Sequence, residues 1–187
     1  MKKGSYMSQE DVEEYLLAGT RRNKKRRIRY EQGKQKIIKT KKELEKFIRN
    51  AVSKRGIEEF AVYGKVCPQL REKVILASHG TVDIVGKYLE LSSTDLWHAF
   101  YNHQTAKEIG NMDLSFDELV YALDNIHVAE VEKVVKRENG KLTLELSLEI
   151  TGGKIILIEV VSKSAGSISL KTCWKVDLEK YIQIYKK

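Results

Sequence analysis

Two histidines stand close together in the segment LWHAFYNH, residues 96–103. Histidine titrates near neutral pH, so His98 and His103 are candidates for taking a proton from a hydroxyl group and returning one to a leaving oxygen. On a helix, His98 and Asn102 share one face, whereas His98 and His103 point about 140° apart. The histidines therefore lack the i, i+4 spacing of a zinc pair. The chain also has no HExxH, CxxC, GxGxxG or phosphate-loop motif, so we expect acid–base chemistry without a metal or a cofactor.

A second group of polar side chains belongs to the last predicted strand. Lys163 precedes this strand, and Thr172, Trp174 and Lys175 lie on it. Lysine and threonine stabilise the charge on a phosphate and bond its oxygens, and tryptophan stacks on a base. Strict alternation places Ile168, Leu170, Thr172 and Trp174 on one face, and Ser169, Lys171, Cys173 and Lys175 on the other. Thr172 and Lys171 share a face only if a β-bulge interrupts the strand.

Each candidate also has a structural interpretation. His98 lies among aromatic residues and is also consistent with a partly buried histidine whose hydrogen bonds are satisfied. His103 is near the end of its helix, where a cation interacts favourably with the helix dipole. Trp174 is a core residue unless its ring faces a substrate. The sequence leaves open which histidine faces the sheet.

Hydrophobic periodicity and capping residues predict the elements that position these groups. Ser8 and Thr40 are candidate helix N-caps, the latter with Glu43 in a capping box. Further helices are predicted over residues 68–78, after residues 92–95 and after Ser115. Strands are predicted over residues 60–66, 82–91, 131–137, 142–150, 155–161 and 168–175. We expect an α+β fold with helices packed on one face of a small, mainly antiparallel, four-to-five-stranded sheet.

The basic residues are concentrated at the start of the chain. The 187 residues carry a net charge of +8, but residues 1–55 alone hold 18 Lys/Arg against 7 Asp/Glu. The densest part, which we call the basic block, contains Arg21, Arg22, Lys24, Lys25, Arg26, Arg27 and Arg29. Such a block attracts polyanions through counterion release, or it is a solvated arm that aids solubility. We expect residues 1–55 to form a basic helical extension and residues 56–187 to form the α+β domain.

Composition argues against a membrane-spanning or disulfide-rich class. The hydrophobic fraction is 42%, and the longest apolar runs are far too short to span a bilayer. The start, MKKGSYMSQEDVEE, lacks the apolar run of a secretory signal. Cys67 and Cys173 are far apart and form no metal motif, so we expect a cytoplasmic protein with reduced cysteines.

The order of these segments resembles a known group of nucleases. A strand with YGKV, a helix, a second strand, the helix with WHAFYNH, the segment LSFDEL and a meander ending in GSISLKTCWK follow one another within residues 57–180. This order is similar to the barnase–EndoU–colicin–RelE-like nucleases, in the branch carried by phages and mobile elements. The positions that match its pattern are His98 or His103, the helix start at Ser115, the strand residues Leu170, Thr172 and Trp174, and Lys163 before the turn.

The resemblance implies metal-independent cleavage of RNA through a 2′,3′-cyclic phosphate. RNA is the implied partner, and an immunity or antitoxin protein is left open. The chain departs from the pattern in having Trp174 where tyrosine is usual. It also has no arginine in its last strands, so Lys163 or Lys175 would stabilise the phosphate charge instead.

We therefore expect a toxin- or effector-type endoribonuclease. His98 and His103 would transfer protons, Thr172 and Lys163 would contact the phosphate, and the basic block would bind RNA. One alternative is a non-catalytic nucleic-acid-binding protein, which needs only the basic block and an exposed sheet face. Another is a phage structural or assembly protein that docks through the apolar stripes of its first helices.

Overall fold

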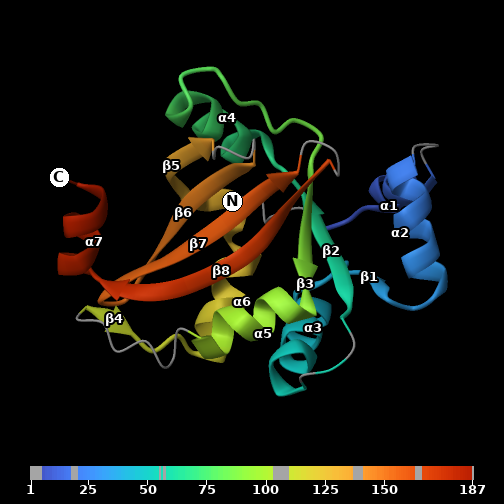
Figure 1. Cartoon of the computed structure of the whole chain (residues 1–187), viewed down its shortest axis with the longest axis horizontal. Helices are drawn as coiled ribbons and strands as arrows, with labels where there is room; N and C mark the ends of the chain where they lie inside the picture. Colours follow the sequence, from blue (N-terminus) through green and yellow to red (C-terminus); the bar gives the residue numbers. More distant parts are fainter. Residues whose placement is uncertain are drawn as a thin grey trace.

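Figure 1 shows the computed structural model of the chain, which describes residues 6–17, 21–54, 56, 58–102, 110–136, 141–162 and 166–186. The helices in these ranges are α1 (Gln9–Leu17), α2 (Arg21–Glu31), α3 (Lys41–Ser53), α4 (Pro68–Ala77), α5 (Ser93–Asn102), α6 (Phe116–Asp124) and α7 (Leu178–Tyr185), with a short 3-10 helix η1 (Ile126–Val128). The strands are β1 (Gln35–Ile37), β2 (Phe60–Lys65), β3 (Tyr88–Ser92), β4 (Asn111–Met112), β5 (Glu130–Lys136), β6 (Leu142–Ile150), β7 (Gly153–Ser162) and β8 (Ser167–Asp177).

These strands form one mixed sheet of eight strands. Its order is β1-β2-β3-β8-β7-β6-β5, with β4 paired to β8. The meander from β5 to β8 is antiparallel, but β1 pairs with β2 and β3 pairs with β8 in parallel. The predicted α+β class is confirmed. The predicted small antiparallel sheet was wrong, because strands from the first half of the chain extend the meander through the parallel pairing of β3 with β8.

The sheet is apolar on both faces and is covered on both. Helices α3 to α6 pack on one face, the core face, where Leu144 and Leu157 of the sheet meet Leu44, Leu96 and Leu119 of the helices. The other face, the outer face, is covered at its two ends. There α1 packs on Val62 and Tyr88, and α7 packs on Ile156 and Val176. Figure 1 shows α7 and the α1–α2 pair at opposite ends of the sheet.

The expectation that helices pack on one face was therefore wrong. The cause lies in β7, where Ile155 and Leu157 point to the core face while Ile156 and Ile158 point to the outer face. Apolar side chains on both sides of a strand are stable only when both sides are shielded from water. Covering helices on the outer face meet this need at the ends of the sheet.

Residues 35–53, which the sequence assigned to the basic extension, join the main sheet and core. Strand β1 pairs with β2 in parallel, and Leu44, Phe47 and Ile48 of α3 lie in the core shared with the meander. The basic block forms the helix α2.

Local capping signals are confirmed where the sequence placed them. The Thr40 side chain accepts a hydrogen bond from the Glu43 N–H, and the Glu43 carboxylate accepts one from the Lys39 N–H at 2.6 Å. Ser115 and Glu118 form a complete capping box at the start of α6. Pro68 is the first residue of α4. These signals succeed because both partners of each hydrogen bond lie within four residues of each other.

The strand predicted over residues 82–91 is formed only from Tyr88 onward. Asp83 instead accepts a hydrogen bond from the Val85 N–H at 2.9 Å, and Gly86 has a positive φ of 65°. This turn chemistry ends the extended backbone before Tyr88.

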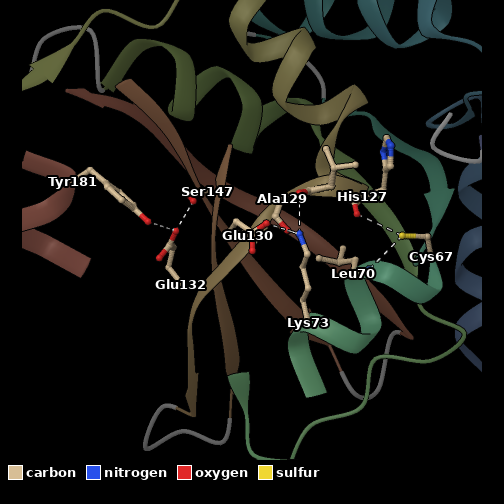
Figure 2. A network of polar contacts seen from close by, with 10 residues as sticks. Cys67, Leu70, Lys73, His127, Ala129, Glu130, Glu132, Ser147 and Tyr181 are labelled. Atoms are coloured by element: carbon tan, nitrogen blue, oxygen red, sulfur yellow. Dashed lines mark hydrogen bonds and ion pairs between the residues drawn. The ribbon is translucent and has the colours of Figure 1, made fainter. Parts of the chain in front are cut away.

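Glu132 ties α7 to the outer face of the sheet. The pairing of β5 with β6 skips Glu132, which marks a β-bulge. Its carboxylate accepts hydrogen bonds from the Ser147 hydroxyl at 2.5 Å and the Tyr181 hydroxyl at 2.6 Å, as Figure 2 shows. The bulge thus places an acidic group where it holds a helix.

Helix α4 is tied to η1 and β5 by a second group of contacts (Figure 2). Lys73 donates hydrogen bonds to the carbonyl oxygens of Val128 and Ala129, both at 3.0 Å, and to Glu130 Oε1 at 2.7 Å. The Cys67 sulfur caps α4 by accepting from the Leu70 N–H. These contacts fix α4 against the core face of the sheet.

In the described ranges no helix is both long enough and apolar enough to cross a bilayer.

Candidate functional site

A β-bulge at Lys171 decides which side chains of β8 share a face. Thr172 pairs with Ile158 and Leu170 pairs with Glu159, so Lys171 is the extra residue on β8. Ile168, Leu170 and Cys173 all belong to the core. Ser169, Thr172 and Trp174 consequently point to the outer face together. Strict alternation, which placed Ser169 opposite Thr172, was wrong because the bulge shifts the pattern by one residue.

The bulge also connects β8 to the helix that carries His98. Lys171 Nζ lies 2.5 Å from Asp95 Oδ2, in the first turn of α5. On the side of β3 and β4, β8 is paired only at residues 167–169 and 175–176 within the described ranges. Helix α5 packs against β8. The Asp95–Lys171 ion pair therefore brings α5 to the stretch of β8 that holds Thr172.

His98 is exposed, one helical turn after Asp95. Its ring lies edge-on to Trp97, with centroids 5.4 Å apart. The alternative interpretation of His98 as a partly buried histidine is therefore wrong, because its side chain is exposed. His98 is thus accessible to a ligand that approaches β8 along α5.

Trp174 is partly a core residue and partly exposed. It lies at the margin of the apolar cluster of Ile156, Val176 and Tyr181 under α7, and its side chain stays partly exposed. One part of the ring supports α7, and the exposed part lies on the outer face with Thr172. A base stacked there would extend this apolar cluster.

Lys175 lies on the opposite face. Its side chain is 13% exposed, and its Nζ lies 2.7 Å from Glu118 Oε1 on α6. Partial burial of Glu118 opposes its ionisation, but hydrogen bonds from Lys175 and Ser115 outweigh this effect and lower its pKa. Lys175 and Trp174 thus lie on opposite faces of β8, as strict alternation predicted for these two residues. Two further candidates, His103 and Lys163, lie outside the described residues.

The basic block is divided between the interior and the surface. Arg26 is 3% exposed, its guanidinium lies 2.9 Å from Glu90 on β3, and it stacks on the Tyr15 ring at 4.2 Å. Arg29 lies over the Phe60 ring at 4.1 Å. These two arginines contact side chains of the sheet, and the buried Arg26 is not exposed to a polyanion.

The outward side of α2 keeps the other described cations of the block. Lys24, Lys25 and Arg27 are exposed, and Arg27 pairs with Glu31 at 2.9 Å on the helix surface. Arg21 and Arg22 begin the helix, and their side chains are outside the described part of the structure. The exposed cations of the described block therefore lie on a helix face rather than on an arm.

Sequence reasoning missed Glu159, a buried acid beside the bulge. It is 1% exposed on the core face of β7, opposite Leu170, and its Oε1 has no hydrogen-bond partner. Burial raises the pKa of Glu159 well above its usual range, with the positive charge of Lys171 opposing and the charge of Asp95 adding to the rise. The only signal in the sequence is one acidic residue within the apolar run IILIEVV.

Replacing Glu159 with glutamine is expected to flatten the pH dependence of stability. Above a pH of about 4.3, the unfolded chain releases the Glu159 proton while the folded chain keeps it, so stability falls as pH rises toward the folded pKa. The limiting slope for one proton is about 1.4 kcal/mol per pH unit. Glu159→Gln removes this loss and is expected to be more stable than the wild type at pH 8, with the gain shrinking toward pH 4.

Urea unfolding from pH 4 to pH 8 measures this effect. Glu149→Gln, an exposed glutamate on the neighbouring strand β6, is the matched control and is expected to follow the wild-type curve. A Glu159→Gln protein that keeps the wild-type pH slope would show that this carboxyl is ionised in the folded state.

Among the described residues, Cys173 is not a reactive thiol and no group of side chains is arranged to bind a metal ion. Burial, followed by the nearby Glu159, raises the pKa of the Cys173 thiol to about 12, so its thiolate is not formed at neutral pH. Within the described ranges, no three His, Cys, Asp or Glu side chains gather closely enough to hold a metal ion. The described residues place the exposed His98 on α5, which covers the core face, whereas Ser169, Thr172 and Trp174 of β8 point to the outer face. Comparison of the chain with protein-family models, curated proteins and solved structures gives no match.

Proposed function

We propose that this protein is a metal-independent endoribonuclease of the toxin or effector type. The observation that carries the proposal is the Asp95–Lys171 ion pair, which joins the helix of His98 to the bulge beside Thr172. Because α5 lies on the core face and Thr172 points to the outer face, a phosphodiester that meets both His98 and Thr172 would lie across the stretch of β8 between residues 169 and 175, which has no partner strand on the side of β3 and β4 in the described ranges. The resemblance of the segment order to the barnase–EndoU–colicin–RelE-like nucleases supports the same reading.

In the proposed reaction, His98 accepts the proton of a ribose 2′-hydroxyl, and the 2′-oxygen attacks the adjacent phosphorus. The bond from phosphorus to the 5′-oxygen breaks, leaving a 2′,3′-cyclic phosphate. The departing 5′-oxygen takes a proton from a second acid, the role that the sequence assigns to His103. The Thr172 hydroxyl donates to a non-bridging oxygen, Lys163 offsets its charge, and Trp174 stacks on a base.

An RNA cleavage assay in the presence of EDTA tests this proposal. The purified chain is expected to cleave single-stranded RNA and to leave 2′,3′-cyclic phosphate and 5′-hydroxyl ends. The same oligonucleotide with 2′-deoxy sugars is the control and is expected to stay intact, because it lacks the attacking hydroxyl. Cleavage of both substrates, or of neither, would end the transphosphorylation proposal.

A second candidate function is nucleic-acid binding without catalysis. The outward cations of α2 favour it, since Lys24, Lys25 and Arg27 form an exposed face opposite the buried Arg26. Binding of this kind reads the phosphate backbone rather than the base sequence. It is compatible with catalysis, because α2 and α5 contact different parts of the sheet.

Removing the outward charges of α2 is expected to weaken RNA binding and its salt dependence together. In the Lys24→Gln, Lys25→Gln, Arg27→Gln variant, the slope of log K against log salt is expected to fall by about 2, since each phosphate contact to a single strand contributes about 0.7. Fluorescence anisotropy with a labelled RNA at several salt concentrations measures this slope. The double variant Lys42→Gln, Lys46→Gln on α3 is the control. Equal slopes in both variants would place the binding surface elsewhere.

A further inference from the structure

A cavity of about 510 Å³ opens at the end of the core face away from α5. Its walls come from the C-terminal end of α4, the loop that follows it, and the strands β5, β6 and β7. In Figure 1 this region lies beneath α4, where β5 and β6 approach it. The volume falls within the range of small-molecule binding sites.

The floor of the cavity is one row of side chains across three strands. Lys136, Leu142 and Val161 are direct neighbours in the strand register, and Val134 lies one step further along β5. The other described residues of β5 that point to the core face, Val131 and Val134, are apolar. Lys136 is thus a cation at the edge of an otherwise apolar floor.

His79 at the rim adopts a backbone conformation that favours glycine. Its φ is 51°, and among the described residues His79 is the non-glycine residue with a positive φ. It follows the end of α4, where Gly80 N–H closes the helix by donating to the Ile75 carbonyl at 2.8 Å. A side chain at this position costs about 1 kcal/mol relative to glycine. The chain bears this cost at a residue that lines the cavity.

The charges around the cavity are unequal. Lys87 and Lys136 are the lining lysines, and Asp83 is the lining acid. Asp83 is already held by Arg71, through two contacts of 2.7 Å between its carboxylate and the guanidinium. That pairing lowers the pKa of Asp83 to about 2. Among the described lining residues, the cavity therefore combines an apolar floor with the exposed cation Lys136 at its edge.

We propose that this cavity binds a small organic anion with an apolar body, such as a nucleoside monophosphate or a medium-chain carboxylate. The body lies on Leu142, Val161 and Val134, and the anionic group lies at Lys136 and His79. This site is separate from the candidate site at His98, and it stands whether or not the protein cleaves RNA. The competing explanation is that Lys136 only protects the edge strand β5 from pairing with other chains.

Titration by heteronuclear NMR tests the proposal with two anions and two neutral counterparts. The probes are adenosine 5′-monophosphate and octanoate, compared with adenosine and 1-octanol. At least one anion is expected to shift the amide signals of residues 79–87, 134–136 and 142, and to bind about tenfold more tightly than its neutral counterpart. Which anion binds identifies whether the body is a nucleoside or an alkyl chain.

Three variants separate binding from edge protection. Lys136→Gln is expected to weaken anion binding about tenfold. Lys133→Gln changes a lysine of the same strand that points to the outer face, and it is expected to bind as the wild type does. His79→Gly is expected to raise the melting temperature while weakening binding, which a purely structural histidine would not do.

The proposal is overturned if neither anion binds at concentrations up to about 10 mM. It is also overturned if Lys136→Gln or His79→Gly binds the anion as tightly as the wild type. Signal changes confined to the surroundings of His98 would likewise assign the anion to the candidate nuclease site instead.

Discussion

Replacing Glu90 with alanine is expected to lower the free energy of unfolding by about 3–5 kcal/mol, the range for breaking a buried ion pair. The variant leaves the Arg26 guanidinium, which is 3% exposed, without the carboxylate that lies 2.9 Å from it. It also removes the acceptor of the Tyr15 hydroxyl hydrogen bond. Because Tyr15 and Arg26 belong to α1 and α2, the loss falls on the attachment of both helices to the sheet.

Urea unfolding and hydrogen exchange measure the two parts of this expectation. Amide exchange in α1 and α2 is expected to accelerate more than exchange in the meander. Glu31→Ala is the control, since it breaks the exposed Arg27–Glu31 pair and is expected to cost about 0.5 kcal/mol or less. A Glu90→Ala loss no larger than that of Glu31→Ala would mean that α1 and α2 are held by apolar contacts alone.

A double replacement tests whether charge is needed at this contact. The Arg26→Met, Glu90→Leu variant removes both charges and keeps apolar volume between Tyr15 and Tyr88. Buried ion pairs replaced in this way are often neutral or more stable. We expect the double variant to recover most of the stability that Glu90→Ala loses, which distinguishes an unpaired buried charge from lost packing.

The second large effect is expected on catalysis. His98→Ala is expected to lower kcat/KM for RNA cleavage by about 10² to 10⁴, the contribution of a general acid or base. Its melting temperature is expected to change little, because His98 is exposed on α5. Cleavage kinetics in EDTA, with thermal unfolding of the same samples, measure both quantities.

His127→Ala is the matched control for this experiment. His127 is a partly buried histidine of η1, and its carbonyl oxygen accepts a hydrogen bond from the Cys67 thiol at the start of α4 (Figure 2). It is expected to cleave RNA at the wild-type rate. If the wild type and a His98→Ala, His103→Ala double variant show the same background, the catalytic proposal is abandoned and the binding function remains.

Much of the fold was predictable wherever the deciding contacts are local. The caps at Thr40 and Ser115 join residues three positions apart, and the structure has them as predicted. The alternation of Leu142, Leu144, Leu146 and Leu148 predicted a strand, and these residues lie in the core. The second face of this strand was expected to be solvated, but Thr143 and Ser147 on it are buried. The strands predicted over residues 142–150, 155–161 and 168–175 are formed as β6, β7 and β8, which are neighbours in the sheet.

The candidate site was predictable in part. The exposed His98 was found from its residue type and helix, and Thr172 and Trp174 from their strand. The ion-pair partners of Lys175 and Arg26 were not predictable from the sequence. Lys175 forms an ion pair with Glu118, and Arg26 forms one with Glu90. Both acids are distant in sequence, and no local pattern specifies such a partner.

The sequence by itself determined the helices, the meander, the basic block and the residue types available for acid–base chemistry. Only the tertiary structure decided which of them share a surface. The bulge at Lys171 lies in the pairing of β7 with β8, and Lys171 forms an ion pair with Asp95 of α5. The bulge places Ser169 on the same face as Thr172. Register and ion pairing depend on segments that are far apart in the chain, so short-range periodicity cannot encode them.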